Sequence, residues 1–324
     1  MEDVARAAGV SMVTVSRALN TPDKLAPATL AAVRVAIDKL RYVHNLTAGS
    51  LASNRTGIIA AIVPTIASST FSDTIDGLAQ ALAPHRYQLL LGQTQYRDAE
   101  EAALIAAFLG RRVDALMLIG VRHARGVRAT LQRAGIPVVE TWDLTPRPID
   151  HVVGFSNRAA GLAAARHLAG KGYASLGFIG GLDHRSAARL EGFRTGAREC
   201  GCGEVPTVRV PSPATVLDGS MALARLLELP KPPRAVFCTH DMLAAGALFE
   251  CQRRGIGVPA PLAVMGFADL PIAAGTVPAL TSMQVRATAM GQRAGELLLR
   301  RLAGEPDLER IVDLGFTVVE RGSA

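Results

Sequence analysis

The sequence predicts a small all-α unit followed by a larger α/β unit that contains two doubly wound lobes with parallel sheets. Three observations support this fold class. Apolar residues recur at helical spacing in residues 1–42, residues 45–56 are polar and rich in small side chains, and from residue 57 onward short apolar runs alternate with helix-length stretches. Such alternation is typical of a parallel sheet that crossover helices cover on both faces.

Length and composition limit the classes of protein to which the chain can belong. Its 324 residues exceed one typical domain of about 100–200 residues, so we expect two or three units. A hydrophobic content of 49% and a charged content of 19% exclude disordered, collagen-like and coiled-coil proteins. The longest apolar runs, such as residues 57–63, are far shorter than the roughly 20 residues of a membrane span, and no leader opens the chain. We therefore expect a cytoplasmic protein.

The first 42 residues predict three short helices. The first extends from Glu2 to Ala8 and ends at Gly9, because glycine commonly follows a helix C-terminus. Ser11 caps the second helix, residues 12–19, by accepting a hydrogen bond from an amide of its first turn. The third begins near Pro27, and its apolar residues are three and four positions apart: Leu30, Val33, Ile37 and Leu40.

The larger unit predicts alternating strands and helices. We expect buried strands at residues 58–63, 88–91, 115–119, 138–139, 176–179, 235–238 and 263–265. The crossover helices are expected at residues 71–83, 98–109, 157–170, 186–199, 216–227, 241–254 and 288–303.

The first two helices and their short turn indicate a helix-turn-helix that binds DNA. Residues 1–56 contain seven Lys and Arg against four Asp and Glu, within a net charge of +7 for the chain. Arg17 can bond a guanine edge with two N–H groups, and short hydroxyl or amide side chains suit phosphates. A hairpin that only caps the larger unit is the alternative. The predicted DNA contacts here are Ser11, Met12, Val13, Thr14, Ser16, Arg17 and Asn20.

Motifs along the whole chain resemble those of the LacI/GalR family of repressors. They are Asp3-Val4-Ala5, Ser16-Arg17, Tyr42, Asn45, residues 48–52, 113–116, 134–139, 189–193 and 240–246. Within that family the chain is most similar to the gluconate operon repressors, through residues 237–239, 249–253 and 313–317. Repressors of related sugar acids are an alternative.

The resemblance implies a division of the chain by function. Residues 1–44 are expected to form a helix-turn-helix DNA-binding headpiece, residues 45–56 a hinge helix or linker, and residues 57–324 an effector-binding domain with the fold of periplasmic binding proteins. In the family, paired hinge leucines enter the minor groove and kink the operator. This adds Asn45, Ala48 and Leu51 to the expected DNA contacts. A plain flexible linker is the alternative, since Gly49 costs about 1 kcal/mol in a helix.

The same resemblance divides the effector domain into two lobes and suggests an upstream start. The first lobe is expected at about residues 57–155 and 285–315, and the second at about 156–284 and 316–324, with crossovers near Phe155, Gln284 and Gly315. Family members carry several residues, including a capping Thr, ahead of the first helix. We therefore expect the natural chain to begin upstream of Met1.

The resemblance places a small effector between the lobes, with Arg189 as its clamp. The chain departs from the family at two positions: His240 precedes Asp241 where Asn is usual, and Ala268 stands where an acid is usual. The loss of a carboxylate reduces the repulsion of an anion, which favours a sugar acid such as gluconate. The alternatives are that Asp269 replaces the missing acid, and that Arg189 is a surface arginine.

Further candidates for effector contacts each have a structural alternative. Phe71, Trp142 and Phe155 are candidate apolar walls behind the ligand and equally candidate core residues. His123 follows an expected strand near the cleft mouth, and a solvated loop histidine is the alternative.

No complete motif of an enzyme appears in the sequence. Gly177, Gly180 and Gly181 follow an expected strand but lack the dinucleotide-binding order, and Lys171 lacks the glycine of a phosphate loop. The four cysteines are expected to be reduced thiols, and we expect neither a metal nor a cofactor.

The predicted function is therefore a homodimeric repressor that acts in the cytoplasm at the bacterial nucleoid. Two headpieces would read a pseudo-palindromic operator, and a sugar acid, gluconate or a relative, would release them. A response to a neutral sugar, action with a corepressor, action as an activator and, remotely, a nucleotide-dependent enzyme are the alternatives.

Overall fold

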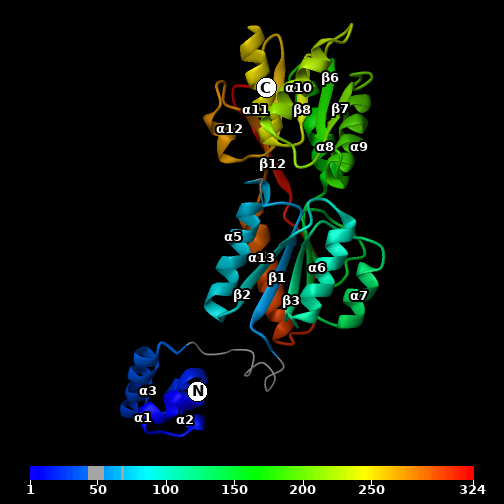
Figure 1. Cartoon of the computed structure of the whole chain (residues 1–324). Coiled ribbons are helices and arrows are strands. Elements are labelled where there is room, and N and C mark those ends of the chain that lie inside the picture. Colours follow the sequence, from blue (N-terminus) through cyan, green and yellow to red (C-terminus); the bar gives the residue numbers. More distant parts are fainter. Residues whose placement is uncertain (43–54, 67–68) are drawn as a thin grey trace. The chain divides into compact units, whose positions relative to one another are not determined.

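The computed structural model describes residues 1–42, 55–66 and 69–324 (Figure 1). The chain forms two compact units, Met1–Thr56 and Gly57–Ala324. The predicted hinge contacts Asn45, Ala48 and Leu51 lie outside the described residues. None of the helices in the described part is both long and apolar enough to cross a membrane.

The first unit contains the three predicted helices, α1 (Glu2–Ala8), α2 (Met12–Asn20) and α3 (Pro27–Leu40). Gly9 ends α1 in the left-handed conformation at a φ of 66°, which glycine adopts without a steric penalty. Ser11 caps α2, because its hydroxyl accepts the hydrogen bond of the Thr14 amide at 3.2 Å. The helices pack around a small apolar core that contains Val4, Val15, Val33 and Ala36.

The second unit begins with a lobe built on a six-stranded sheet in which all neighbours are parallel. The strand order is β11-β5-β4-β3-β1-β2. The strands are β1 (Ile58–Val63), β2 (Gln88–Gln93), β3 (Ala115–Ile119), β4 (Val138–Thr141), β5 (His151–Gly154) and β11 (Ile311–Asp313). The helices of this first lobe are α5 (Ser72–Leu82), α6 (Asp98–Gly110), α7 (Val127–Ala134) and α13 (Ala287–Leu302).

The second lobe contains another six-stranded sheet, of order β12-β10-β9-β8-β6-β7. Its last strand, β12, is antiparallel to β10, so parallel pairing is dominant rather than complete. The strands are β6 (Leu176–Gly181), β7 (Thr207–Val210), β8 (Ala235–Cys238), β9 (Ala263–Ala268), β10 (Thr281–Val285) and β12 (Phe316–Val319). The helices are α8 (Asn157–Gly170), α9 (His184–Glu199), α10 (Val216–Leu227), α11 (Asp241–Arg254) and α12 (Pro271–Gly275). The predicted fold class is confirmed.

Three short connections carry the chain between the lobes. They join β5 to α8, β10 to α13, and β11 to β12. Figure 1 shows α13 beside α5 in the first lobe, although the chain reaches α13 only after it has built most of the second lobe. Loops at the ends of the strands therefore face one another across the junction of the lobes, as is usual for ligand sites in open parallel sheets.

Two glycines hold α9 close against α8. A Cβ atom at Gly161 of α8 would collide with the backbone of Arg189, and one at Gly192 of α9 would collide with the backbone of Arg158. The two helix backbones can therefore approach more closely than side chains would allow. This contact fixes the helix that carries Arg189.

Candidate functional site

The second helix of the first unit presents an exposed surface of mixed character. Met12 and Val13 are 54% and 60% exposed, and Arg17 is also exposed, whereas Val15 is completely buried. The hydroxyls of Ser11 and Thr14 lie 2.9 Å apart at the start of this surface. An apolar pair beside a guanidinium suits contact with base edges and thymine methyls. The side chain of Asn20 lies outside the described residues.

Two adjoining cavities lie between the lobes of the second unit. The inner cavity measures about 50 Å³ and the outer cavity about 440 Å³. They share four wall residues: Tyr96, Asp183, Arg185 and Ser212. Loops that follow strands of both lobes contribute to the inner cavity, and its main wall residues are Thr70, Phe71, Tyr96, Trp142, Asp183, Arg185, Arg189, Thr239, His240 and Phe267.

Arg189 is buried in the inner cavity and held in place by three neighbours. Its Nε donates to Asn157 Oδ1 at 2.9 Å and its Nη1 to the carbonyl of Thr239 at 2.7 Å. The guanidinium carbon lies 3.7 Å from the centre of the Phe267 ring. Burial lowers the pKa of Arg189 to about 10, which still leaves it charged at neutral pH. The predicted role as a clamp is compatible with this geometry, and the alternative of a surface arginine is wrong.

A second arginine, Arg185, lies one helical turn before Arg189 and lines both cavities. Its guanidinium carbon lies 5.3 Å from the centre of the Phe71 ring, and its Nε lies 3.9 Å from Asp183 Oδ1. Sequence reasoning missed this residue. The available signal was its spacing of four from Arg189, which places both side chains on one face of α9.

Asp183 caps α9 between the two cations. Its Oδ1 accepts the amide hydrogen bonds of Arg185 and Ser186, both at 3.1 Å. Burial alone would raise the pKa of Asp183, but the charges of Arg185 and Arg189 hold it below its usual value. Asp183 is the only carboxylate on the described wall of the inner cavity, so two cations there face one anion.

His240 connects the two lobes across the inner cavity. Its Nδ1 accepts the Met242 amide hydrogen bond at 3.2 Å and so caps α11, while its Nε2 contacts the hydroxyl of Thr70 in the other lobe. Since Nδ1 is an acceptor, the proton of the neutral ring lies on Nε2. Burial and then the charge of Arg189 lower the pKa of His240 to about 4. The ring is therefore neutral at physiological pH.

Aromatic rings form one continuous group at the back of the inner cavity. The ring centres of Phe71 and Trp142 are 5.0 Å apart, those of Trp142 and Phe155 6.0 Å, and those of Phe155 and Phe267 5.9 Å. Phe71 and Trp142 line the cavity as expected, and so does Phe267, which sequence reasoning did not select. Phe155 is completely buried behind them and belongs to the core.

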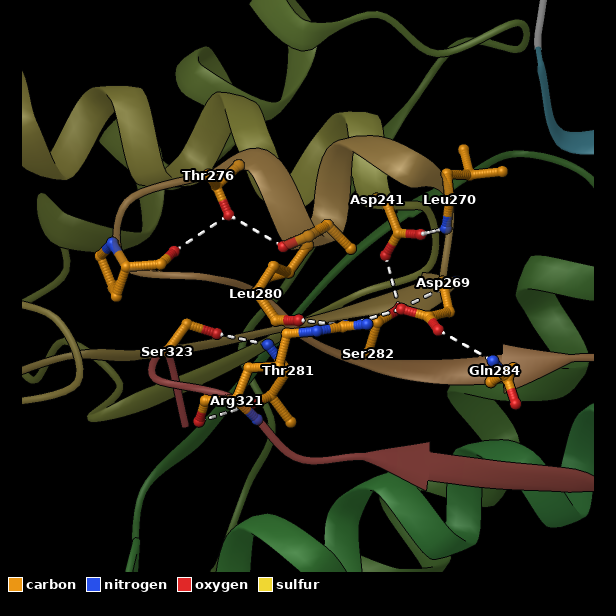
Figure 2. A network of polar contacts seen from close by, with 12 residues as sticks. Asp241, Asp269, Leu270, Thr276, Leu280, Thr281, Ser282, Gln284, Arg321 and Ser323 are labelled. Atoms are coloured by element: carbon orange, nitrogen blue, oxygen red, sulfur yellow. Dashed lines mark hydrogen bonds and ion pairs between the residues drawn. The ribbon is translucent and has the colours of Figure 1, made fainter.

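The structure corrects the expected role of Asp241. Its carboxylate is completely buried and accepts hydrogen bonds from the Leu270 amide at 2.7 Å and the Ser282 hydroxyl at 2.6 Å (Figure 2). Burial raises its pKa to about 7. Asp241 therefore joins α11 to the ends of β9 and β10 and does not line the inner cavity.

Ala268 and Asp269 lie on a different cavity. It measures about 240 Å³, is located at the crossover between β10 and α13, and shares Thr70 and Trp142 with the inner cavity. The carboxylate of Asp269 is bonded to Arg321 at 2.7 Å and to Gln284 at 3.0 Å (Figure 2). Because its carboxylate is occupied in this way, Asp269 does not replace the missing acid beside Arg189.

The structure also corrects both interpretations of His123. Its Nδ1 lies 2.7 Å from Glu101 and its Nε2 lies 3.0 Å from Glu140, and its side chain is 5% exposed. Burial alone would lower the pKa of His123, but the two hydrogen-bonded glutamates raise it to about 9. His123 is thus a buried cation that supports Glu101, a wall residue of the outer cavity, and is neither a ligand contact nor a solvated loop residue.

Comparison with known families gives two matches along the chain. Residues 1–45 match the model described as bacterial regulatory proteins, lacI family. Residues 165–324 match the model of the periplasmic binding protein-like domain. The first match contains α1 to α3, and the second contains Arg185, Arg189 and His240.

Individual relatives are similar over nearly the whole chain. The HTH-type transcriptional regulator GntR of Pseudomonas aeruginosa is 37% identical over 100% of this chain and 95% of its own length. A LacI family transcriptional regulator from Silicibacter pomeroyi superposes with a TM-score of 0.91 at 31% identity, covering 99% of this chain and 98% of that one. The transcription regulator GntR from Chromobacterium violaceum gives a TM-score of 0.79 at 35% identity over 82% of this chain and 98% of its own.

Proposed function

This chain belongs to the lacI family of bacterial regulatory proteins, and we propose that it is a transcriptional repressor whose release from DNA is controlled by a sugar acid such as gluconate. The observation that carries the effector class is the arrangement of Arg185 and Arg189, one turn apart on α9 and both in the inner cavity. The names of the GntR relatives are consistent with gluconate.

The inner cavity has the charge needed for a carboxylate. Two guanidinium groups face a single aspartate, so the protein leaves one positive charge there for a ligand to balance. In the described contacts, Arg189 donates two of its five N–H groups, one to Asn157 and one to Thr239. The other three can donate to a ligand. A carboxylate can accept two of them in parallel.

The remaining wall suits the hydroxyl groups of a sugar acid. Thr70, Tyr96, Ser212 and Thr239 carry hydroxyls on this wall, and His240 holds the Thr70 hydroxyl in place through its Nε2. The inner cavity is too small for a whole six-carbon acid, so the chain of hydroxyls would extend into the outer cavity. Phe71 and Trp142 provide the apolar wall behind the carbon chain.

The DNA-binding part of the proposal depends on α2. Met12, Val13 and Arg17 would contact base edges, and Ser11, Thr14, Ser16 and Asn20 would contact phosphates. Two headpieces of a homodimer would bind the halves of a pseudo-palindromic operator, with Asn45, Ala48 and Leu51 at its centre. The protein would then act at the nucleoid, in the cytoplasm.

Coupling between the effector cavity and the DNA-binding helix α2 requires an effector that prefers one arrangement of the lobes. It can shift the equilibrium only by its difference in affinity for the two arrangements. The bond between Thr70 and His240 crosses the cavity, so a ligand beside it changes a contact between the lobes. We propose that this change separates the two hinges of the dimer and releases the operator.

Calorimetric titration of the full chain with gluconate, 2-ketogluconate, glucose and ribose tests the effector class. We expect heat of binding from one acid and none from the neutral sugars. Binding of a neutral sugar alone would refute the sugar-acid assignment and leave the family unaffected. A parallel anisotropy measurement with fluorescent operator DNA gives the sign of coupling, because an effector that tightens DNA binding would be a corepressor.

A further inference from the structure

An arginine-rich groove lies on the surface of the second lobe. It measures about 510 Å³ and shares no wall residue with the inner or outer cavity. One wall is the face of α9 from Ala187 to Arg198, and the other residues come from α8 and β7. We call this surface the arginine groove. Its charged residues are Arg158, Glu191, Arg194, Arg198 and Arg209.

Three of its four arginines have no carboxylate partner among the described residues. Arg194 donates to the hydroxyl of Thr207 at 3.3 Å, Arg209 donates to the carbonyl of Gly181 at 2.7 Å, and Arg198 forms no ion pair. Only Arg158 is paired, with Glu191 at 3.0 Å, and both of these side chains are more than 60% exposed. Exposed pairs of this kind contribute little. The groove therefore has an excess of three positive charges.

The arginines of α13 and Arg166 of α8 are paired with carboxylates, whereas Arg133 of α7 and Arg225 of α10 form no ion pair among the described residues. On α13, Arg293 pairs with Glu296 and Glu309, Arg300 with Glu305, and Arg301 with Asp150. On α8, Arg166 pairs with Glu199 at 2.8 Å, close to the groove. Three unpaired guanidinium groups in one concavity repel one another, and an anion would remove that cost.

We infer that the arginine groove is a docking site for an acidic segment of a partner protein. The groove follows α9 from Ala187 to Arg198, a rise of about 16 Å, which is longer than a single phosphate group. Leu190 and Ala187 lie at one end and Arg194 and Arg198 at the other. An extended segment of about five residues with Asp or Glu side chains and one apolar side chain matches this length and sequence of groups.

Helix α9 contributes wall residues to both the arginine groove and the inner cavity. Arg185 and Arg189 of α9 line the inner cavity, whereas Arg194 and Arg198 line the groove. A segment bound in the groove would thus contact the helix that carries the effector clamp. This inference does not depend on the identity of the effector.

Fluorescence anisotropy of a labelled hexaglutamate peptide with the full chain tests the inference. We expect saturable binding that weakens as salt rises, and at least tenfold weaker binding in the Arg194→Gln/Arg198→Gln variant. The matched control is Arg166→Gln, which removes a paired arginine of the neighbouring helix and should change the affinity less than twofold. The headpiece is present in all three proteins, so differences between them report the groove.

Three outcomes would overturn the inference. Equal binding by the double variant and the control would place the peptide elsewhere. Displacement of the peptide by inorganic pyrophosphate at millimolar or lower concentration would make the groove a site for compact anions, and equal displacement by duplex DNA would make it a nucleic-acid surface. If the double variant fails to fold, judged by its thermal unfolding, Arg198→Gln alone serves, and it should weaken binding at least threefold.

Discussion

Two buried histidines of the second unit differ completely in protonation. His123 lies in the first lobe between Glu101 and Glu140 and has a pKa of about 9, so it is a cation at neutral pH. His240 lies in the second lobe beside Arg189 and has a pKa of about 4, so it is neutral. Burial disfavours the charged form in both cases. The difference therefore comes from the sign of the nearest charge, and residue type and burial alone do not predict it.

The two histidines consequently have different roles. Charged His123 holds two carboxylates that also accept the amide hydrogen bonds of Ala124 at 2.7 Å and Ile149 at 2.6 Å. It fixes four segments of the first lobe. Neutral His240 instead caps α11 and contacts the opposite lobe, where it can respond to a ligand.

Replacement of His123 should have the largest effect on stability. In His123→Ala, Glu101 and Glu140 lose their cation while Glu140 stays completely buried, and removal of one partner of a buried ion pair costs about 3–5 kcal/mol. Urea denaturation measures this loss. His85→Ala, which removes an exposed histidine, is the control and should change the free energy of unfolding by less than about 0.5 kcal/mol. A similar small change in both variants would contradict the assigned role of His123.

The two histidines should contribute terms of opposite slope to the pH dependence of stability. Both rings titrate near pH 6.5 when unfolded. Above that pH the folded protein keeps a proton on His123 that the unfolded chain has lost, so this ring's contribution, roughly 3 kcal/mol, disappears as the pH rises through about 9. Below pH 6.5 the unfolded chain protonates His240 and the folded protein does not, so the contribution of this ring falls as the pH falls toward about 4. Asp241, whose folded pKa of about 7 lies above its unfolded value, acts in the opposite sense over the same range. Each histidine's contribution is therefore measured as the difference between the wild type and His123→Ala or His240→Asn in urea unfolding from pH 4 to 10, and an unchanged alkaline slope in His123→Ala would contradict the first.

Replacement of Arg189 should change the neutral histidine and the effector site together. Arg189→Gln removes charged hydrogen bonds worth about 2–3 kcal/mol, so gluconate affinity should fall roughly 100-fold. It also removes the positive charge beside His240, whose pKa should rise above about 4 while burial still holds it below 6.5. Calorimetry and NMR titration of the His240 ring measure the two effects. Arg300→Gln, at a partly exposed position of α13 outside both cavities, is the control for affinity. An unchanged pKa of His240 would exclude the charge of Arg189 as its cause.

His240→Asn should have the smallest effect at neutral pH. The amide oxygen of Asn can accept the Met242 hydrogen bond, so the helix cap is kept and stability at pH 7 should change by less than about 1 kcal/mol. Because Asn does not titrate, the variant should become progressively more stable than the wild type as the pH falls from 6.5 toward 4. A constant difference between the two proteins over this range would exclude His240 as a source of the pH dependence.

The sequence predicts the strongly patterned elements of the fold well. The strands at residues 58–63, 115–119 and 235–238 are continuous apolar runs and occur as predicted. It does not predict β5, β7, β10, β11 or β12. These strands contain polar residues such as His151, Arg209 and Ser282, and pairing with neighbours distant in sequence stabilises them.

In the candidate site, too, contacts between residues distant in sequence were not predicted. Phe71, Trp142, Arg189 and His240 were selected, and all four line the inner cavity. The expectations for His123, Asp241 and Asp269 failed because each side chain is occupied by a partner far along the chain. These partners are Glu101 and Glu140 for His123, Ser282 for Asp241, and Arg321 for Asp269. A single sequence does not show such pairing.

The three connections between the lobes limit how the lobes can move relative to each other when a ligand binds. Gly154 and Asn157 bound the first connection, Val285 and Ala287 the second, and Asp313 and Phe316 the third. Each leaves only one or two residues outside regular structure, and a residue spans at most about 3.6 Å. The lobes therefore cannot draw apart, but small changes in a few backbone dihedrals can swing one lobe relative to the other. We therefore expect a ligand in the cleft to change the angle between the two lobes rather than the distance between them.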